Sequence, residues 1–143
     1  MATRSTISLK TESGYSTIYC HWDGYPSHTG RLLEEHYDTQ EKVEELIKLG
    51  SLSYLSKFVK PGDGVSHTFD EPATDVTVAY YRDRKEGTVP YINRYGDINS
   101  VYQYGEDYDY VFEDGKWWLV TKENYAICLE PVRKVKPFAS AAE

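Results

Sequence analysis

The sequence predicts an α+β domain in which an antiparallel sheet of four or five strands carries two or three helices on one face. Two β-hairpin patterns, one near each end of the chain, and a capped amphipathic helix between them lead to this prediction. The 143 residues are the length of one domain. We expect this single domain to span residues 1–130, and residues 131–143 to form a flexible tail.

The first hairpin is predicted from alternating apolar and polar residues. Residues 5–10 and 15–22 alternate in this way around a turn of small polar residues. In the second of these strands Cys20 points to the expected core, whereas Tyr19 and His21 lie on the opposite face.

A change to helical spacing follows the hairpin. The run Asp23–Pro26 breaks the second strand, and a helix is expected from about His28 to His36. The next helix begins at a capping signature, with Asp38 or Thr39 at the N-cap, and ends near Leu49. Its apolar residues recur at i, i+3 and i+4, so one face is expected to pack on the sheet.

The second half of the chain carries shorter patterns. They predict a helical turn or packing strip over 51–58, an irregular loop to about residue 72, a strand over 75–82, a helix over 97–104, a hairpin over 108–121 and an edge strand over 124–129. Asp114-Gly115 at the centre of the hairpin favours a type I′ turn. The segment 89–95 is ambiguous, because Pro90 argues against a central strand. The irregular loop is long enough to be functional.

Composition and charge exclude several classes of function. The net charge of −7 disfavours direct binding to nucleic acid or to an anionic membrane. No apolar run has the length of a membrane span, and the first ten residues lack the apolar core of a signal peptide. Cys20 and Cys128 are expected to be free thiols in a reducing cytosol, and no cofactor or metal site is predicted.

Tyrosine is unusually frequent, with 14 Tyr against 4 Phe and 3 Trp. A phenol joins a large rigid ring to one polar end, which suits a binding surface. Tyrosine also favours strands with wet edges, so both interpretations remain open. A tyrosine-rich sheet edge is also compatible with a homodimer.

The densest group of side chains that can both pack and bind is Tyr19-Cys20-His21-Trp22-Asp23-Gly24-Tyr25-Pro26. His21 and Asp23 are two apart, so they could form an acid–base pair on one face of a strand. Alternatively, both could fix the turn through backbone hydrogen bonds, which is the common role of Asp before Gly.

Two further groups carry charge. Arg82 and Arg84 are two apart and could present paired guanidinium groups to phosphate or carboxylate. With Arg4 and Arg31 they could form a local positive pocket; the alternative is a solvated strand end with surface ion pairs. An acidic group could instead imitate the phosphates of nucleic acid, and it comprises Glu106, Asp107, Asp109, Glu113 and Asp114. Its alternative is a solubilising surface.

Several of these segments resemble a group of small proteins that tailed phages and prophages encode. The segments are Thr3-Arg4-Ser5-Thr6-Ile7, Ile18-Tyr19-Cys20-His21-Trp22-Asp23-Gly24-Tyr25-Pro26, Gly30-Arg31-Leu32-Leu33, Tyr80-Tyr81-Arg82-Asp83-Arg84 and Tyr108-Asp109-Tyr110-Val111-Phe112. The resemblance covers most of residues 3–120, and the tail departs from it. It implies an accessory phage protein that works in the cytoplasm of the bacterial host, where such proteins often counter host defences.

We therefore expect a non-catalytic binding protein that inhibits a host protein or sequesters a small ligand such as a signalling nucleotide. The expected binding surface comprises Tyr19, His21, Trp22, Asp23, Tyr25, Arg31, Tyr80, Arg82 and Arg84. One alternative is an acidic inhibitor that mimics nucleic acid and blocks a host nucleic-acid-binding enzyme. Another alternative is a small hydrolase that uses His21 and Asp23.

Overall fold

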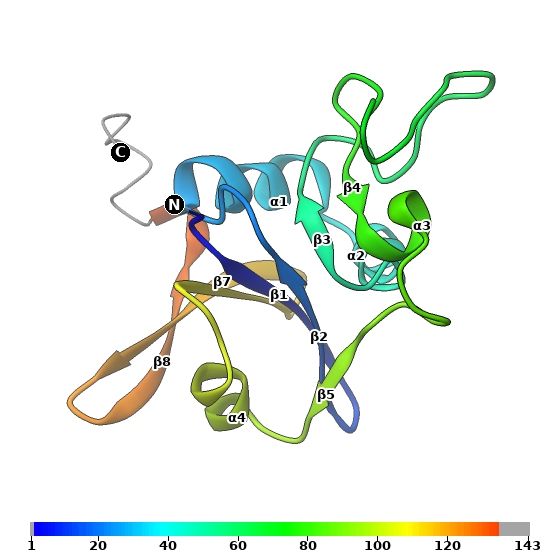
Figure 1. Ribbon diagram of the computed structural model, residues 1–143. Helices are drawn as coiled ribbons and strands as arrows, with labels where there is room; N and C mark the ends of the chain where they lie inside the picture. Colours follow the sequence, from blue (N-terminus) through cyan, green and yellow to red (C-terminus); the bar gives the residue numbers. More distant parts are fainter. Residues whose placement is uncertain (1, 135–143) are drawn as a thin grey trace.

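The computed structural model describes residues 2–134, and within them one eight-stranded mixed sheet carries four short α-helices (Figure 1). The strands are β1 (Ser5–Thr11), β2 (Gly14–Cys20), β3 (Leu52–Tyr54), β4 (Val78–Ala79), β5 (Asn93–Tyr95), β6 (Tyr108–Glu113), β7 (Lys116–Glu123) and β8 (Ala126–Pro131). The helices are α1 (Arg31–His36), α2 (Gln40–Ile47), α3 (Tyr80–Arg84) and α4 (Ile98–Gln103). A π-helical turn, η1 (Pro26–Gly30), precedes α1, and a 3-10 turn, η2 (Val132–Lys134), ends the described chain.

The predicted fold class is wrong in three respects. The sheet is larger than four or five strands and is not antiparallel, because β1 pairs parallel with β6 and β2 pairs parallel with β3. The strand order is β4-β3-β2-β1-β6-β7-β8, and β5 pairs with β2. Helices cover both faces rather than one, since α1 and α2 lie on one face and α4 on the other.

Buried side chains of the central strands point alternately to the two faces of the sheet, so the protein has two cores. Ile7 of β1 and Tyr110 of β6 point to the larger core, which α1 and α2 complete with residues such as Leu46. The opposite face holds a smaller core, in which Val101 of α4 packs on Val111 and its neighbours. Both faces of β1 are therefore buried from Ser5 to Leu9, including the polar residues Ser5, Thr6 and Ser8.

The predictions that depend on turns and helix caps are confirmed. The first hairpin closes with Thr11 opposite Gly14, and Asp114-Gly115 has the positive φ angles of a type I′ turn. The side chain of Thr39 accepts a hydrogen bond from the backbone N–H of Lys42 at the start of α2. The predicted edge strand is β8, which within residues 2–134 pairs only with β7.

The strand predicted over 75–82 is mostly wrong. Strand pairing here is limited to the two residues of β4 and a single isolated bridge between Val76 and Phe58, and the chain then turns into α3 at Tyr80. The carboxylate of Asp83 accepts a hydrogen bond from the backbone N–H of Ala79, and this contact stabilises the start of the helix. The segment 51–58, predicted as a helical turn or packing strip, contains the short strand β3, and its Leu52 and Leu55 are buried in the larger core.

The regular fold continues to the end of the described residues. Pro131 ends β8, and Val132 is fully buried against the larger core. Of the residues 131–143 expected to form a tail, 135–143 lie outside the described residues.

Candidate functional site

The turn after β2 is held by contacts that its sequence makes necessary. Gly24 has no room for a side chain, because a Cβ there would lie 2.6 Å from the Cβ of Ser5. Its carbonyl accepts a hydrogen bond of 2.7 Å from the hydroxyl of Tyr110, and Thr29 donates one of 2.8 Å to the carbonyl of Asp23. Much of the Cys-His-Trp-Asp-Gly-Tyr-Pro run is therefore explained by packing of this turn.

Tyr19, His21 and Trp22 form a chain of aromatic contacts on the solvent side of this turn. A hydrogen bond of 2.6 Å joins the phenol oxygen of Tyr19 to Nδ1 of His21, and the His21 and Trp22 rings meet edge to face at 4.6 Å. Burial raises the pKa of Tyr19, while Arg4 opposes the rise. Trp22 remains 44% exposed, so this group can contact a partner.

The acid–base pair suggested by the spacing of His21 and Asp23 is not assembled. Within residues 2–134, the hydrogen bond and ring contacts of His21 go to Tyr19 and Trp22, and none goes to Asp23. Asp23 has a positive φ of 55° and occupies the turn before Gly24. The His21–Asp23 pair on which the hydrolase alternative depends is therefore not formed within residues 2–134.

The guanidinium of Arg82 makes its hydrogen bonds within the fold. It donates to the backbone carbonyls of Val59 at 2.5 Å and Thr77 at 2.8 Å, and also to the carboxylate of Asp83. It therefore ties together both ends of the loop between β3 and β4. The two arginines of the Arg-Asp-Arg run do not form one paired anion site, because Arg84 points elsewhere.

Arg84 borders a shallow aromatic cleft of about 480 Å³. Its guanidinium lies over the rings of Phe69 and Tyr80, with distances of 4.5 and 5.0 Å to the ring centroids, and it pairs with the carboxylate of Glu86. The cleft is lined by Tyr19, Ser51, Tyr80, Tyr81, Arg84, Glu86, Gly87, Val89 and Tyr91. Three of these, Tyr19, Tyr80 and Arg84, belong to the surface predicted from the sequence.

The outer wall of the aromatic cleft is formed by residues that sequence patterns did not single out. Val89 and Tyr91 are 68% and 65% exposed, and they lie in the irregular segment before β5. This wall therefore offers an exposed apolar side chain and an exposed phenol to a partner. The high tyrosine content was the available signal, but no periodicity pointed to this segment.

The remaining predicted residues lie outside the aromatic cleft. Tyr25 is half-buried beside η1, with its ring 6.2 Å from that of His28, and Arg31 is exposed at the start of α1. Both side chains make further interactions within the molecule.

The five acidic residues do not form one continuous surface. Glu106 and Asp107 precede β6, whereas Glu113 and Asp114 lie at its other end. Asp109 between them points inward and accepts hydrogen bonds on Oδ1 from the Thr6 hydroxyl, at 2.6 Å, and from the Glu106 backbone N–H, at 2.9 Å. Burial raises the pKa of Asp109 to about 6. A mimic of a phosphate row would require all of these carboxylates to face outward.

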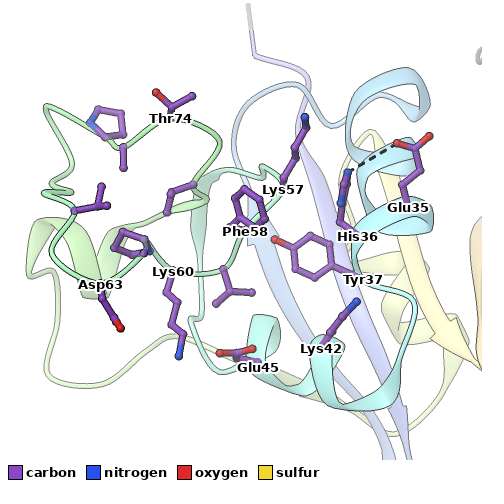
Figure 2. A pocket seen from close by; sticks show the side chains of 17 residues that line it. Glu35, His36, Tyr37, Lys42, Glu45, Lys57, Phe58, Lys60, Asp63 and Thr74 are labelled. Atoms are coloured by element: carbon purple, nitrogen blue, oxygen red, sulfur yellow. Dashed lines mark ion pairs between the residues drawn. The ribbon is translucent and has the colours of Figure 1, made fainter.

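A larger cleft of about 1040 Å³ lies between helices α1 and α2 and the loop after β3 (Figure 2). Phe58 is 55% exposed in the cleft, and Val65 also lines it. Figure 2 shows Phe58 and Tyr37 near its centre, with lysines and carboxylates around the rim. The rim carries Lys42, Lys57, Lys60, Glu35, Glu45 and Asp63. None of the predicted binding residues lines this cleft, although its far wall is the long loop after Phe58.

Comparison with known proteins does not assign either cleft, because no family model, curated protein or solved structure matches the chain. In the part of the chain that the structure describes, no helix is long and apolar enough to cross a membrane. Across residues 2–134, no three His, Cys, Asp or Glu side chains are grouped to hold a metal ion. The two clefts offer aromatic rings, phenols and paired charges, which suit binding.

Proposed function

We propose that this chain is a non-catalytic binding protein whose aromatic cleft holds a protein partner. The observation that carries the proposal is that three segments, β2, α3 and residues 86–91, bring tyrosines and one arginine to the same recess. Tyrosine and arginine are the residue types that dominate binding energy at protein interfaces. The phenols add hydrogen-bonding ends to rigid rings with few rotatable bonds.

Charge favours a protein over a nucleotide in this cleft. Arg84 is the one cation among the lining residues, and its ion pair with Glu86 leaves no surplus positive charge for a phosphate group. The net charge of −7 acts in the same direction. The resemblance to phage-encoded proteins supports a partner from the bacterial host, and inhibition of a defence protein is the corresponding role.

The larger cleft favours a second candidate function, which is sequestration of a small ligand. Phe58 offers an exposed ring on which a base can stack, and Lys57 and Lys60 stand at the rim without an ion pair among the described residues. Its volume is similar to that of many small-molecule sites. A ligand with an aromatic ring and an anionic group, such as a nucleotide, matches this chemistry.

Native mass spectrometry of protein purified gently from a bacterial lysate tests both functions. We expect the wild-type chain to carry a bound protein, and the double variant Val89→Ser/Tyr91→Ala to lose it. Both side chains are exposed, so this variant keeps the fold. Phe58→Ser is the matched control in the larger cleft and should retain the partner.

The outcomes separate the two sites. A protein partner that remains on the double variant would overturn the assignment to the aromatic cleft. A small bound mass that is lost from Phe58→Ser and retained by the double variant would instead establish sequestration in the larger cleft.

A further inference from the structure

The far edge of the sheet is open along its whole length. β8 forms six consecutive residue pairs with β7, without a bulge, and no strand of the described chain pairs with its other side. Figure 1 shows the β7–β8 hairpin extending away from the body of the molecule. The other outer strands are short, with two residues in β4 and three in β5. β8 is therefore the longest free edge within residues 2–134.

The middle of β8 lacks the devices that usually protect an edge, because its charged residue, Glu130, and its proline are the last two residues of the strand. Monomeric proteins place lysine, proline or a bulge in the middle of an exposed edge strand, because unpaired peptide groups attract other strands. The middle of β8 is instead Ile127-Cys128-Leu129, each half-buried, and its proline stands at the last position. The strand contains no lysine or arginine.

The smaller core is also open at this edge. Ile127 and Leu129 pack against the cluster that contains Val111 and Val120, yet both stay partly exposed. In an antiparallel ladder, every second residue of a strand hydrogen-bonds to its neighbour. Ala126 closes the two-residue turn and bonds to β7, so the peptide groups of Ile127 and Leu129 point away from β7. The same two residues thus offer apolar side chains and free hydrogen-bonding groups.

The turn before β8 presents a tyrosine in a strained conformation. Tyr125 is 95% exposed and has a positive φ of 66°, which is unfavourable for a bulky residue. Gly115 occupies the corresponding position in the β6–β7 turn, with a φ of 73°. Backbone strain that brings no internal contact is typical of a residue with a role outside its own fold.

From these observations we propose that the free edge of β8 pairs antiparallel with β8 of a second copy of this chain, about a two-fold axis at Cys128. This register sets Ile127 opposite Leu129 of the second copy, so the smaller cores join across the interface. It also brings Tyr125 to Pro131 of the second copy, where the exposed ring can pack. The two Cys128 residues then face each other.

The dimer leaves the aromatic cleft free. The cleft lies at the β2–β3–β4 end of the sheet, and β8 is the opposite end. The proposal is thus independent of the function proposed above. A continuous sheet would carry two copies of the cleft at its outer ends. Because each chain has a net charge of −7, association is expected to strengthen as salt screens the repulsion.

Cys128 provides a direct test on the full-length chain. In the proposed register the two Cys128 residues form a non-hydrogen-bonded pair, with their Cα atoms about 4.5 Å apart, which is within the range of a disulfide. Oxidation by copper–phenanthroline in air should therefore give a covalent dimer on a non-reducing gel. Cys20 is fully buried and should not form a cross-link.

Sedimentation velocity at increasing concentration supplies the second readout and a matched pair of variants. Cys128→Ser should dimerise like the wild type but resist cross-linking. Cys128→Lys should weaken dimerisation about tenfold or more, because it sets like charges directly opposite each other. A chain that stays monomeric at every concentration would overturn the proposal. A dimer that Cys128→Lys leaves intact would do so as well, because it must use another surface.

Discussion

His67 Nε2 lies 3.1 Å from the carboxylate Oδ2 of Asp83, and both side chains are almost completely buried. The backbone N–H of Ala73 donates to Nδ1 of His67 at 2.9 Å, so Nε2 carries the proton and donates to Asp83. Arg82 contacts the same carboxylate, and Arg84 stacks on Phe69. The Arg-Asp-Arg run therefore clamps the loop that forms one wall of the larger cleft.

Removing the centre of this clamp should destabilise the whole fold. Asp83→Ala leaves Arg82 and His67 without their buried acceptor, and we expect a loss of about 3 kcal/mol in the free energy of unfolding. Urea denaturation measures it. Arg84→Ala is the control, and because its ion pair is exposed the expected loss is below about 1 kcal/mol. Equal losses for the two variants would contradict the clamp.

Asp109 should make stability depend on pH. Its pKa in the folded chain is about 6, against 3.8 ordinarily, because burial disfavours the charged form. The folded state therefore prefers the protonated carboxyl. Protonation of Asp109 therefore contributes about 3 kcal/mol to the free energy of unfolding below about pH 4. This contribution is lost as the pH rises through 6.

Asp109→Asn isolates this contribution. The amide oxygen can accept both hydrogen bonds that reach Oδ1, so the variant should be more stable than the wild type at neutral pH by up to about 3 kcal/mol. The advantage should vanish near pH 4. Denaturation curves at a series of pH values decide the matter, and parallel curves for wild type and Asp109→Asn would rule out titration of Asp109.

The comparison of sequence with structure shows which signals are local. Thr39 at the start of α2 and Asp114-Gly115 between β6 and β7 act on their immediate neighbours, and both were predicted. The parallel pairing of β1 with β6 joins Thr6 to Asp109, which is 103 residues away. The sequence of neither strand indicates that it pairs with the other, so the mixed sheet could not be predicted.

Polar residues also concealed the central position of β1. Thr6 and Ser8 alternate with Ile7 and Leu9, which is the pattern of a strand with one wet face. Both polar residues are buried, because Thr6 donates to Asp109 and the hydroxyls of Ser8 and Thr17 lie 2.7 Å apart. In the candidate site, Tyr19, Tyr80 and Arg84 were found from local density. Tyr91 lies in a segment without periodicity, and the helical spacing that includes Phe58 predicted packing rather than binding.

The two cysteines should differ sharply in reactivity. Cys20 is fully buried, and burial raises the pKa of its thiol to about 12, whereas Cys128 is partly exposed on β8. Only the thiolate reacts with a disulfide reagent such as DTNB. We expect Cys128 to be labelled in the native chain, and Cys20 only after denaturation, as measured by absorbance. Labelling of Cys20 in the native Cys128→Ser chain would show that the core opens at this strand.

The two hairpin turns offer a paired test of backbone strain. Tyr125 and Gly115 occupy equivalent positions with similar positive φ angles, yet only glycine adopts this conformation without cost. Tyr125→Gly should raise the free energy of unfolding by about 1 kcal/mol, and Gly115→Ala should lower it by a similar amount. Thermal unfolding at low concentration measures both variants without a contribution from the proposed dimer. If Tyr125→Gly lowers stability instead, the tyrosine makes a stabilising contact within its own chain, and its exposure would need another explanation.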